Sequence, residues 1–361
     1  MHVGIDARFA RDGGIGTYLR NMVPRVIRLR PSWSFTVLGN PAVVRGMGWE
    51  QLPNVQLSAF TAPAYSIREQ WMAPFASPRG LNVFWAPHYN VPLAVRAPLV
   101  ATIHDVCHLA VHDALDSGIK RTYARVMLDQ VRRRARGILF VSEFSRDEMA
   151  RIVGAPDGIV SIAPNAVAEE WFQGEDSARP LPDPYLAYVG NWKVHKNVPL
   201  LLRAFGRVVQ RIPHRLVLVG RRHGLAADPS IEREVARLGD RVVVTGQVED
   251  AEVRRWVRHA DALVTASRYE GFGLPPLEAM AAGRPCMVAR AGSLPEVCGD
   301  AARYCDPHDE ASVANALVDI ATNHALREEL VRKGHVRARA FDWDRSARLA
   351  AELLEQVGKG R

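Results

Sequence analysis

The chain has 361 residues, and with 48% of them hydrophobic it is long enough to bury two sizeable cores rather than one. It contains no apolar run near the roughly 18 residues that span a bilayer, and its first residues lack the basic-then-apolar order of a secretion signal, so a cytoplasmic location is expected. The formal net charge of +8 leaves nucleic acid, anionic lipid and phosphorylated substrates open as partners.

Strand-like runs alternate with helical patterns along the chain, which indicates α/β architecture with parallel sheets. One series occupies residues 2–7, 34–40, 82–87, 98–104, 137–142 and 159–164, and a second occupies residues 185–190, 215–220, 242–246, 261–267 and 285–290. The stretch Val167–Pro184, polar and proline-rich in its second half, is expected to link them. We therefore expect an N-terminal domain over residues 1–168 and a C-terminal domain over residues 169–342.

Two positions in the first series lie where a ligand could bind. The stretch 13–17, which includes Gly14 and Gly16, is glycine-rich and precedes a helical pattern. A simple tight turn is the alternative, and the spacing is not that of a dinucleotide-binding fingerprint, so nicotinamide is not expected. His104 ends the strand at 98–104, and ligands gather at the carboxyl ends of parallel strands. A structural histidine is the alternative there.

The densest basic cluster ends a helical segment that begins near Ile119. Its members are Arg132, Arg133, Arg134 and Arg136. Cations at a helix carboxyl end are favourable in themselves, and this is one explanation. The other is peripheral docking on an anionic membrane or on a pyrophosphate-linked acceptor. Because the chain shows no recognised nucleic-acid module, a nucleic-acid partner is not expected.

Two glutamates flank a glycine-rich turn after the strand at 261–267. Glu270 is expected at the carboxyl end of the strand, whereas Glu278 falls in the first turns of a helix that a double proline opens. Gly271 and Gly273 let the backbone approach a ligand, and the helix start offers N–H groups to a diphosphate. Glu278 could accept hydrogen bonds from a ribose diol, which leaves Glu270 for hydroxyls of a transferred group. A plain crossover with two solvated glutamates is the alternative.

Residues 269–307 resemble, almost throughout, the donor-site block of the retaining glycosyltransferases of family four. The resemblance implies that the first glutamate of the E-x7-E motif, Glu270, contacts the sugar and that the second, Glu278, contacts the ribose. It also implies that backbone N–H groups of Gly273 and Leu274 bind phosphate. The donor-binding residues expected in this block are Gly271, Phe272, Gly273, Leu274 and Glu278.

The loop after residues 185–190 resembles the pyrophosphate loop of the same family. Lys196 matches the lysine of that loop, a point charge suited to a leaving diphosphate. The sequence departs from the common pattern, because Asn191 stands where many relatives have arginine and His195 stands where a second branch has arginine. Phosphate neutralisation is therefore expected to depend on Lys196, helped by Lys193 or by a protonated His195.

Four further features follow from the resemblance. His104 matches a histidine that lies near the transferred sugar. The glycine-rich stretch 13–17 resembles an acceptor-side loop, and the N–H groups of Gly14 and Gly16 could close over the donor phosphates or shape the acceptor pocket. The Gly292–Ser293 turn resembles a loop under the nucleotide, although such turns are common. Arg221 and Arg222 are in range of the nucleotide in such folds, with ordinary surface arginines as the alternative.

The resemblance implies a GT-B fold, in which two Rossmann-like domains face each other across a cleft and the final segment, residues 343–361, crosses back onto the first. It implies a retaining glycosyltransferase without bound metal or cofactor, moving a hexose from a nucleotide sugar to a glycan or lipid-linked acceptor in surface-polysaccharide assembly. GDP-mannose is the preferred donor, with dTDP-rhamnose, UDP-glucose and UDP-N-acetylglucosamine open. A GT-B nucleotide-sugar epimerase and a non-catalytic nucleotide-sugar-binding subunit are the alternative functions.

Overall fold

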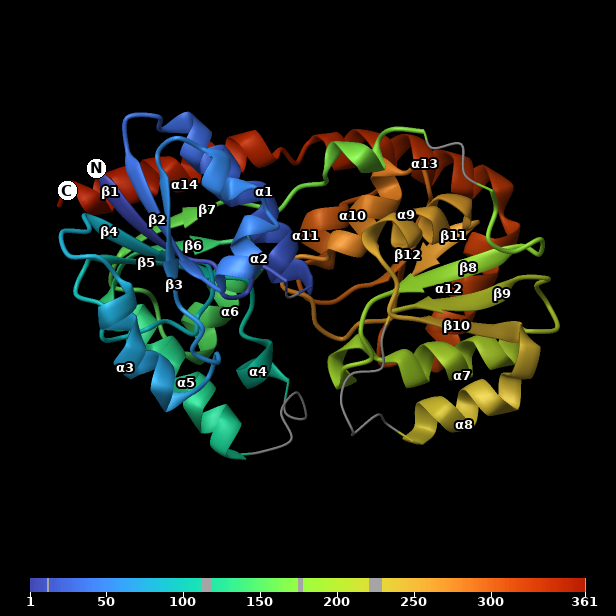
Figure 1. Cartoon of the computed structure of the whole chain (residues 1–361). Helices are drawn as coiled ribbons and strands as arrows, with labels where there is room; N and C mark the ends of the chain where they lie inside the picture. Colours follow the sequence, from blue (N-terminus) through green and yellow to red (C-terminus); the bar gives the residue numbers. More distant parts are fainter. Residues whose placement is uncertain (12, 112–117, 175–177, 221–228, 361) are drawn as a thin grey trace. The chain divides into compact units, whose positions relative to one another are not determined.

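The chain forms two compact units, each built on its own parallel sheet (Figure 1). The computed structural model describes residues 1–11, 13–111, 118–174, 178–220 and 229–360. Unit 1 comprises Met1–Asn165 and Asp342–Arg361, and unit 2 comprises Ala166–Phe341. The first junction thus precedes the boundary expected after residue 168. The segment expected to be a linker belongs to unit 2, where Val167 and Trp171 are buried.

The sheet of unit 1 has seven strands in the order β3-β2-β1-β4-β5-β6-β7. They are β1 His2–Asp6, β2 Ser34–Gly39, β3 Val55–Ala59, β4 Val83–Ala86, β5 Leu99–Ile103, β6 Ala135–Phe140 and β7 Ile159–Ile162. All pairings are parallel, and every residue of β4 is buried because helices cover both faces. The strand order changes direction between β1 and β4. The carboxyl edge at such a point is where an α/β sheet binds its ligands.

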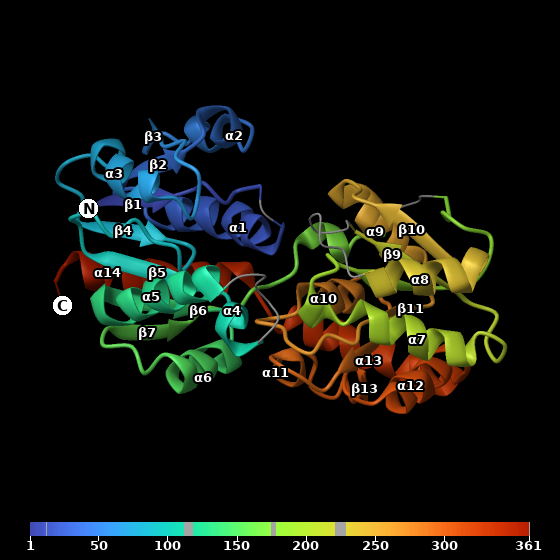
Figure 2. The same cartoon turned by 90° about the horizontal axis from the view of Figure 1, so that it is seen from below.

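Helices cover both faces of this sheet (Figures 1 and 2). In β6, Gly137 meets Leu353 of α14 (Trp343–Gly358), whereas the neighbouring Ile138 packs with Leu128 of α5 (Gly118–Arg134). Because successive strand residues point to opposite faces, α14 and α5 lie on opposite sides. The helix that packs on α14 is α1 Gly13–Leu29, and those that share the side of α5 are α3 Ile67–Ala76 and α6 Glu143–Ile152. The short elements are α2 Pro41–Arg45, η1 Trp49–Gln51 and α4 Cys107–Ala110.

The sheet of unit 2 has six parallel strands in the order β10-β9-β8-β11-β12-β13. They are β8 Tyr185–Val189, β9 Arg215–Val219, β10 Val242–Gly246, β11 Ala262–Val264, β12 Cys286–Ala289 and β13 Arg303–Cys305. Here the order changes direction between β8 and β11. The loops after these two strands carry Lys196 and Glu270, so the topology brings the two residues to one edge.

The helices of unit 2 also form two layers. Right-handed crossovers place helices on one face while the strands run from β8 toward β10, and on the other face while they run from β11 toward β13. The first layer consists of α7 Val198–Val208 and α8 Pro229–Leu238, and α12 Glu310–Thr322 packs beside α7. The second consists of α9 Asp250–His259, α10 Leu274–Ala281 and α11 Leu294–Cys298, with α13 His324–Arg339 packed on α10. The remaining short elements are η2 Glu169–Trp171, η3 Val194–Lys196 and η4 Gly239–Arg241.

The sequence did not predict two edge strands, β3 and β13. Residues 55–59 mix polar and apolar side chains and none of them is fully buried, while β13 has only three residues. Neither gives the apolar run of a central strand.

One helix end also differs from the prediction, because α5 ends at Arg134 and Arg136 lies in β6. The four cysteines are buried free thiols. Within the described ranges, no helix has the length and apolar character needed to cross a bilayer.

Candidate nucleotide-sugar site

Lys196 and Glu270 meet at the carboxyl edge of unit 2. Lys196 ends η3 after β8, and Glu270 lies in the loop after the neighbouring strand β11. The Lys196 Nζ donates to both carboxylate oxygens of Glu270, at 2.8 and 2.7 Å. Their side chains are only 19% and 13% exposed. Because a largely buried charge needs a partner, each group neutralises the other where the strand order changes direction.

Backbone contacts fix the loop that carries this lysine. Asn197 has a left-handed backbone, with φ 58°, which asparagine tolerates better than most residues. Its side-chain amide donates to the carbonyl oxygens of Ala266 and Pro307, at 3.0 and 2.9 Å. The Arg268 N–H donates to the His195 oxygen at 2.8 Å. These bonds tie the loop after β8 to those after β11 and β13.

The turn after β12 holds the backbone of Glu270. Ser293 donates to the Glu270 carbonyl oxygen from its N–H at 3.1 Å and from its hydroxyl at 3.0 Å. Gly292 has φ 59°, and a Cβ there would lie 2.6 Å from the backbone N and O of Glu270. Only glycine permits that approach. The turn that the resemblance placed under the nucleotide therefore positions Glu270 directly.

The start of α10 offers a small set of N–H groups. Gly273, with φ 94° and ψ 57°, precedes the helix, and its lack of a side chain leaves no side-chain cap. The second and third helical residues are Pro275 and Pro276, which have no N–H. The N–H groups without a partner inside an α-helix are those of the N-cap residue and of the first three helical residues, so Gly273 and Leu274 supply the two that remain here. Two such groups at the positive end of a helix suit a phosphate.

Glu278 lies one turn further along α10 and is partly buried. Burial raises the pKa of its carboxyl to about 7; Asp250 adds to the shift and Arg254 opposes it. The carboxyl therefore changes charge close to neutral pH. As a carboxylate it can accept two hydrogen bonds from neighbouring hydroxyls. Arg221 and Arg222, which the sequence placed in range of the nucleotide, lie outside the described residues.

Other expected donor residues have mainly structural contacts. The Asn191 side-chain oxygen accepts a bond from the Lys193 N–H at 3.3 Å, which shapes the loop before η3. Gly271 and Phe272 are buried, and the Phe272 ring packs edge-on against Phe341 at 5.5 Å. Their backbone groups, rather than the phenyl ring, are thus the parts suited to a ligand.

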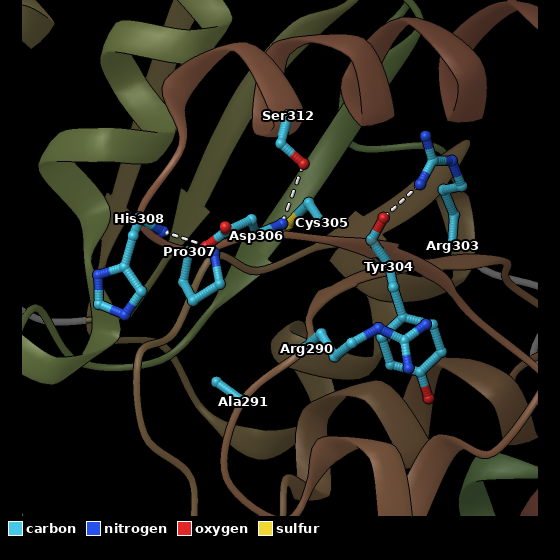
Figure 3. A pocket seen from close by; sticks show the side chains of 9 residues that line it. All are labelled: Arg290, Ala291, Arg303, Tyr304, Cys305, Asp306, Pro307, His308 and Ser312. Atoms are coloured by element: carbon cyan, nitrogen blue, oxygen red, sulfur yellow. Dashed lines mark hydrogen bonds between the residues drawn. The ribbon is translucent and has the colours of Figure 1, made fainter.

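A hollow of about 520 Å³ lies at the carboxyl ends of β12 and β13 (Figure 3). The Arg290 guanidinium lies 4.2 Å from the ring centroid of Tyr304, and the Asp306 N–H donates to the Ser312 hydroxyl at 3.0 Å. The full lining is Arg290, Ala291, Arg303, Tyr304, Cys305, Asp306, Pro307, His308 and Ser312. Because Pro307 also accepts the amide bond from Asn197, the hollow adjoins the lysine loop.

His104 lies at the carboxyl edge of unit 1, directly after β5. Its Nε2 lies 2.9 Å from the Pro87 oxygen, and its ring packs edge-on against Tyr18 at 4.9 Å. Burial lowers the pKa of the imidazole, so it is neutral at pH 7. Since the carbonyl can only accept, Nε2 carries the proton and Nδ1 is left as the acceptor nitrogen.

The predicted glycine loop of unit 1 is wrong in one respect, because Gly14 and Gly16 belong to the first turn of α1, which begins at Gly13. A Cβ at Gly16 would lie 2.7 Å from the Ala10 oxygen, so this glycine allows the helix to pack against the preceding turn. No atom lies within 4 Å of a Cβ built on Gly14, which is exposed. Of the two, Gly14 is therefore the one with room for a ligand.

The sequence missed a buried polar network at the same edge of unit 1. Arg8 donates to Glu69 at 2.6 Å and to Asp6 at 2.7 Å, with all three side chains at most 5% exposed. Glu69 also accepts from the Asn90 amide at 3.0 Å and from the Tyr123 hydroxyl at 3.4 Å. Arg8 and Glu69 are 61 residues apart, so no local pattern could pair them.

The basic cluster at the end of α5 is partly neutralised within unit 1. Arg132 and Arg133 both form ion pairs with Asp129, at 3.2 and 2.9 Å, and Arg132 also pairs with Asp157. Arg134 is exposed at the helix end. The pairs support the explanation that this cluster stabilises a helix end.

Comparison of the sequence with known protein families agrees with the geometry of unit 2. Residues 183–323 match the family described as glycosyl transferases group 1. This segment is a group 1 glycosyltransferase domain. The expected resemblance is thus confirmed at the level of a group 1 glycosyltransferase domain, and the chain is similar to curated glycosyltransferases.

Two relatives illustrate the range of the glycosyltransferase family. The O-antigen chain mannosyltransferase B of Escherichia coli is 27% identical over 73% of this chain and 71% of its own length. A D-inositol 3-phosphate glycosyltransferase of Corynebacterium diphtheriae is 29% identical over 74% of this chain and 65% of its own length.

Solved structures confirm the expected GT-B fold. A sucrose-phosphate synthase from Thermosynechococcus elongatus superposes with a TM-score of 0.79 at 18% identity, covering 100% of both chains. The Anabaena protein HepE, in complex with UDP-glucose, superposes with a TM-score of 0.77 at 16% identity, covering 99% of this chain and 100% of HepE. At these identities the likeness concerns the fold alone.

Proposed function

We propose that this glycosyltransferase moves a hexose from a nucleoside diphosphate to a hydroxyl of a glycan or lipid-linked acceptor in surface-polysaccharide assembly, with retention of configuration. The contact between Lys196 and Glu270 carries the proposal, because it joins a phosphate-neutralising cation to a hydroxyl-binding carboxylate beside a helix start. Mannose from GDP-mannose is the preferred donor. O-antigen mannosyltransferases of Escherichia coli and Salmonella typhimurium among the relatives support mannose, while UDP-glucose in the HepE complex supports a UDP sugar as the alternative.

Donor binding would exchange partners within the ion pair. Lys196 would turn from Glu270 toward the diphosphate, and the released carboxylate would accept hydrogen bonds from sugar hydroxyls. The Gly273 and Leu274 N–H groups would meet the remaining phosphate charge, which grows as the sugar leaves. We therefore propose that transfer needs no bound metal or cofactor. Among the described residues, no group of three or more His, Cys, Asp or Glu side chains is placed to hold a metal ion.

A front-face substitution fits this arrangement. The bond from the anomeric carbon to the phosphate oxygen breaks, and the acceptor oxygen attacks from the same side while its proton passes to the departing phosphate. Glu270 would orient the sugar hydroxyls during this step. We propose that neutral His104 hydrogen-bonds a hydroxyl of the transferred sugar and that Gly14 lies beside a substrate.

The first test separates donor binding from transfer. Purified protein is heated with GDP, GDP-mannose and the corresponding UDP and dTDP compounds, since a bound ligand at a hundredfold excess stabilises by about 2.7 kcal/mol. Lys196→Met should abolish the thermal shift. Glu270→Gln should keep a shift with the nucleotide diphosphate but lose transfer of labelled sugar to an acceptor fraction. Glu310→Gln is the matched control, because Glu310 forms a partly exposed ion pair with Arg203 and not with Lys196.

The outcomes distinguish the alternatives. A shift with a UDP sugar alone overturns the GDP-mannose assignment but keeps the enzyme class. Interconversion of the donor without an acceptor indicates an epimerase. If the protein binds a nucleotide sugar but Glu270→Gln changes no turnover, the protein is a non-catalytic subunit. No thermal shift with any nucleotide sugar at millimolar concentration overturns the donor site itself.

A further inference from the structure

Helix α3 of unit 1 presents two large aromatic side chains to solvent. Trp71 is 73% exposed and Phe75 is 90% exposed. They are four residues apart in the helix and therefore lie on the same face. Glu69 and Ala73, on the inner face, are completely buried and already anchor the helix to the core. The packing of α3 thus does not require a tryptophan and a phenylalanine outside, where such residues are rarely placed without a partner.

Phe75 also borders a hollow of about 460 Å³ between the end of α3 and residues 94–98. Most of its walls are proline, alanine, valine and leucine, and two arginines, Arg79 and Arg96, line it as well. These segments precede β4 and β5, so the hollow lies at the amino edge of the sheet. His104 follows β5 at the opposite edge, and a surface bound at the hollow would leave the ligand edge uncovered.

The charge around the aromatic pair has one sign. Arg68, Arg79 and Arg96 are exposed, and none of the ion pairs formed within the described part of the chain involves them. Arg132 and Arg133 of α5 differ in this respect, because both pair with Asp129. The exposed arginines beside the α3 aromatics are therefore free to contact an anionic partner, whereas two of the four residues in the arginine run are already paired.

We propose that the α3 patch, formed by Arg68, Trp71, Phe75, Arg79 and Arg96, docks this protein on an anionic lipid surface. Trp71 and Phe75 would enter the boundary between headgroups and acyl chains, which aromatic side chains of interfacial helices favour. The three arginines would contact lipid phosphates. The inference is independent of the donor assignment, because no residue of unit 2 takes part.

The size of the patch favours a membrane over a protein partner. A stable protein interface uses about 800 Å² and 20 to 30 residues on each side, far more than two aromatic side chains and three arginines offer. A lipid surface needs only a few inserted side chains and a local positive charge, each basic residue adding about fivefold to binding. The patch meets those needs.

The test is co-sedimentation of the full chain with vesicles of phosphatidylcholine alone or with about one third phosphatidylglycerol. We expect binding to the anionic vesicles that weakens with salt. Trp71→Ser with Phe75→Ser should lower the partition coefficient roughly tenfold or more, since two large apolar side chains no longer enter the lipid. Val336→Ser is the matched control, because Val336 is 75% exposed on α13 in unit 2.

A second variant, Arg79→Gln with Arg96→Gln, tests the charge without changing the aromatic pair. It should lower the partition coefficient for anionic vesicles about 25-fold and remove most of the dependence of binding on salt concentration. Unchanged melting temperatures show that the variants fold. The proposal is overturned if wild-type protein does not sediment with anionic vesicles, or if the aromatic variant binds them as well as Val336→Ser does. It is also overturned if the aromatic variant converts a dimer to a monomer in light scattering while leaving vesicle binding intact.

Discussion

Replacing Glu278 by glutamine should stabilise unit 2, and by an amount that depends on pH. Burial raises the pKa of the folded carboxyl from 4.5 to about 7. Between these values the folded protein holds a proton that the unfolded chain has released, so stability falls as pH rises and the loss is complete above pH 7. At 1.36 kcal/mol for each pH unit between 4.5 and 7, the loss is at most about 3 kcal/mol, and partial exposure reduces it. Glutamine, which carries no charge, avoids the loss.

Urea unfolding at pH 5, 6, 7 and 8 measures the effect as the difference between variant and wild type, which cancels the other titrating groups. The gain from Glu278→Gln should be below about 1 kcal/mol at pH 5 and reach roughly 2 to 3 kcal/mol at pH 8. Glu310→Gln, at a partly exposed ion pair, should show no such rise. An equal gain at pH 5 and pH 8 would refute the reasoning. If Glu278→Gln is more stable than the wild type but binds nucleotide more weakly, the Glu278 carboxylate contributes to nucleotide binding and lowers the stability of the fold.

Three further predictions concern backbone fit, buried charge and a histidine. Gly292→Ala should lower the free energy of unfolding by about 3 kcal/mol or more, because its Cβ would lie 2.6 Å from the Glu270 backbone. Gly239→Ala is the control, because Gly239 has a similar φ of 57° and a Cβ there has no atom within 4 Å. Its loss in thermal unfolding should be about 1 kcal/mol. Glu69→Gln should cost about 3 to 5 kcal/mol in urea, since it removes one carboxylate from a buried arginine; a loss under 1 kcal/mol would contradict the network. Burial lowers the pKa of His104, so stability should fall as pH drops below 6.5, and His104→Asn should reduce that acid loss in melting curves from pH 5 to pH 7.5.

The parts of the site that were predictable from sequence are those set by short segments. Glu270 and Glu278 belong to one strand-turn-helix unit, so their spacing along the chain determines their spacing in the fold. Lys196 was identified through its own loop, but its bond to Glu270 joins residues 74 apart. The role of Gly292 was also hidden, because the atom that excludes a side chain there belongs to another loop.

Local propensity misled the prediction at the start of α1. Three glycines among residues 13–16 disfavour a helix, since each costs up to about 1 kcal/mol relative to alanine. The helix nevertheless begins at Gly13, because Tyr18, Leu19 and Met22 are completely buried against the sheet. Tertiary packing thus overrides propensity, and sequence reasoning cannot weigh it without knowing the neighbours.

The position of α14 has a consequence for the order in which this protein is made. Ala347, Ala350 and Leu354 of this helix are completely buried in unit 1, yet α14 follows the whole of unit 2 in the chain. After Asn165, a ribosome must synthesise the whole of unit 2, Ala166–Phe341, before α14 begins, which takes about 9 to 35 s at 5 to 20 residues per second. During that time the first-made half has an uncovered apolar sheet face, while the later-made half can already fold. Nascent chains should therefore depend on chaperones through unit 1, and removal of α14 should destabilise unit 1 although this helix is made after unit 2.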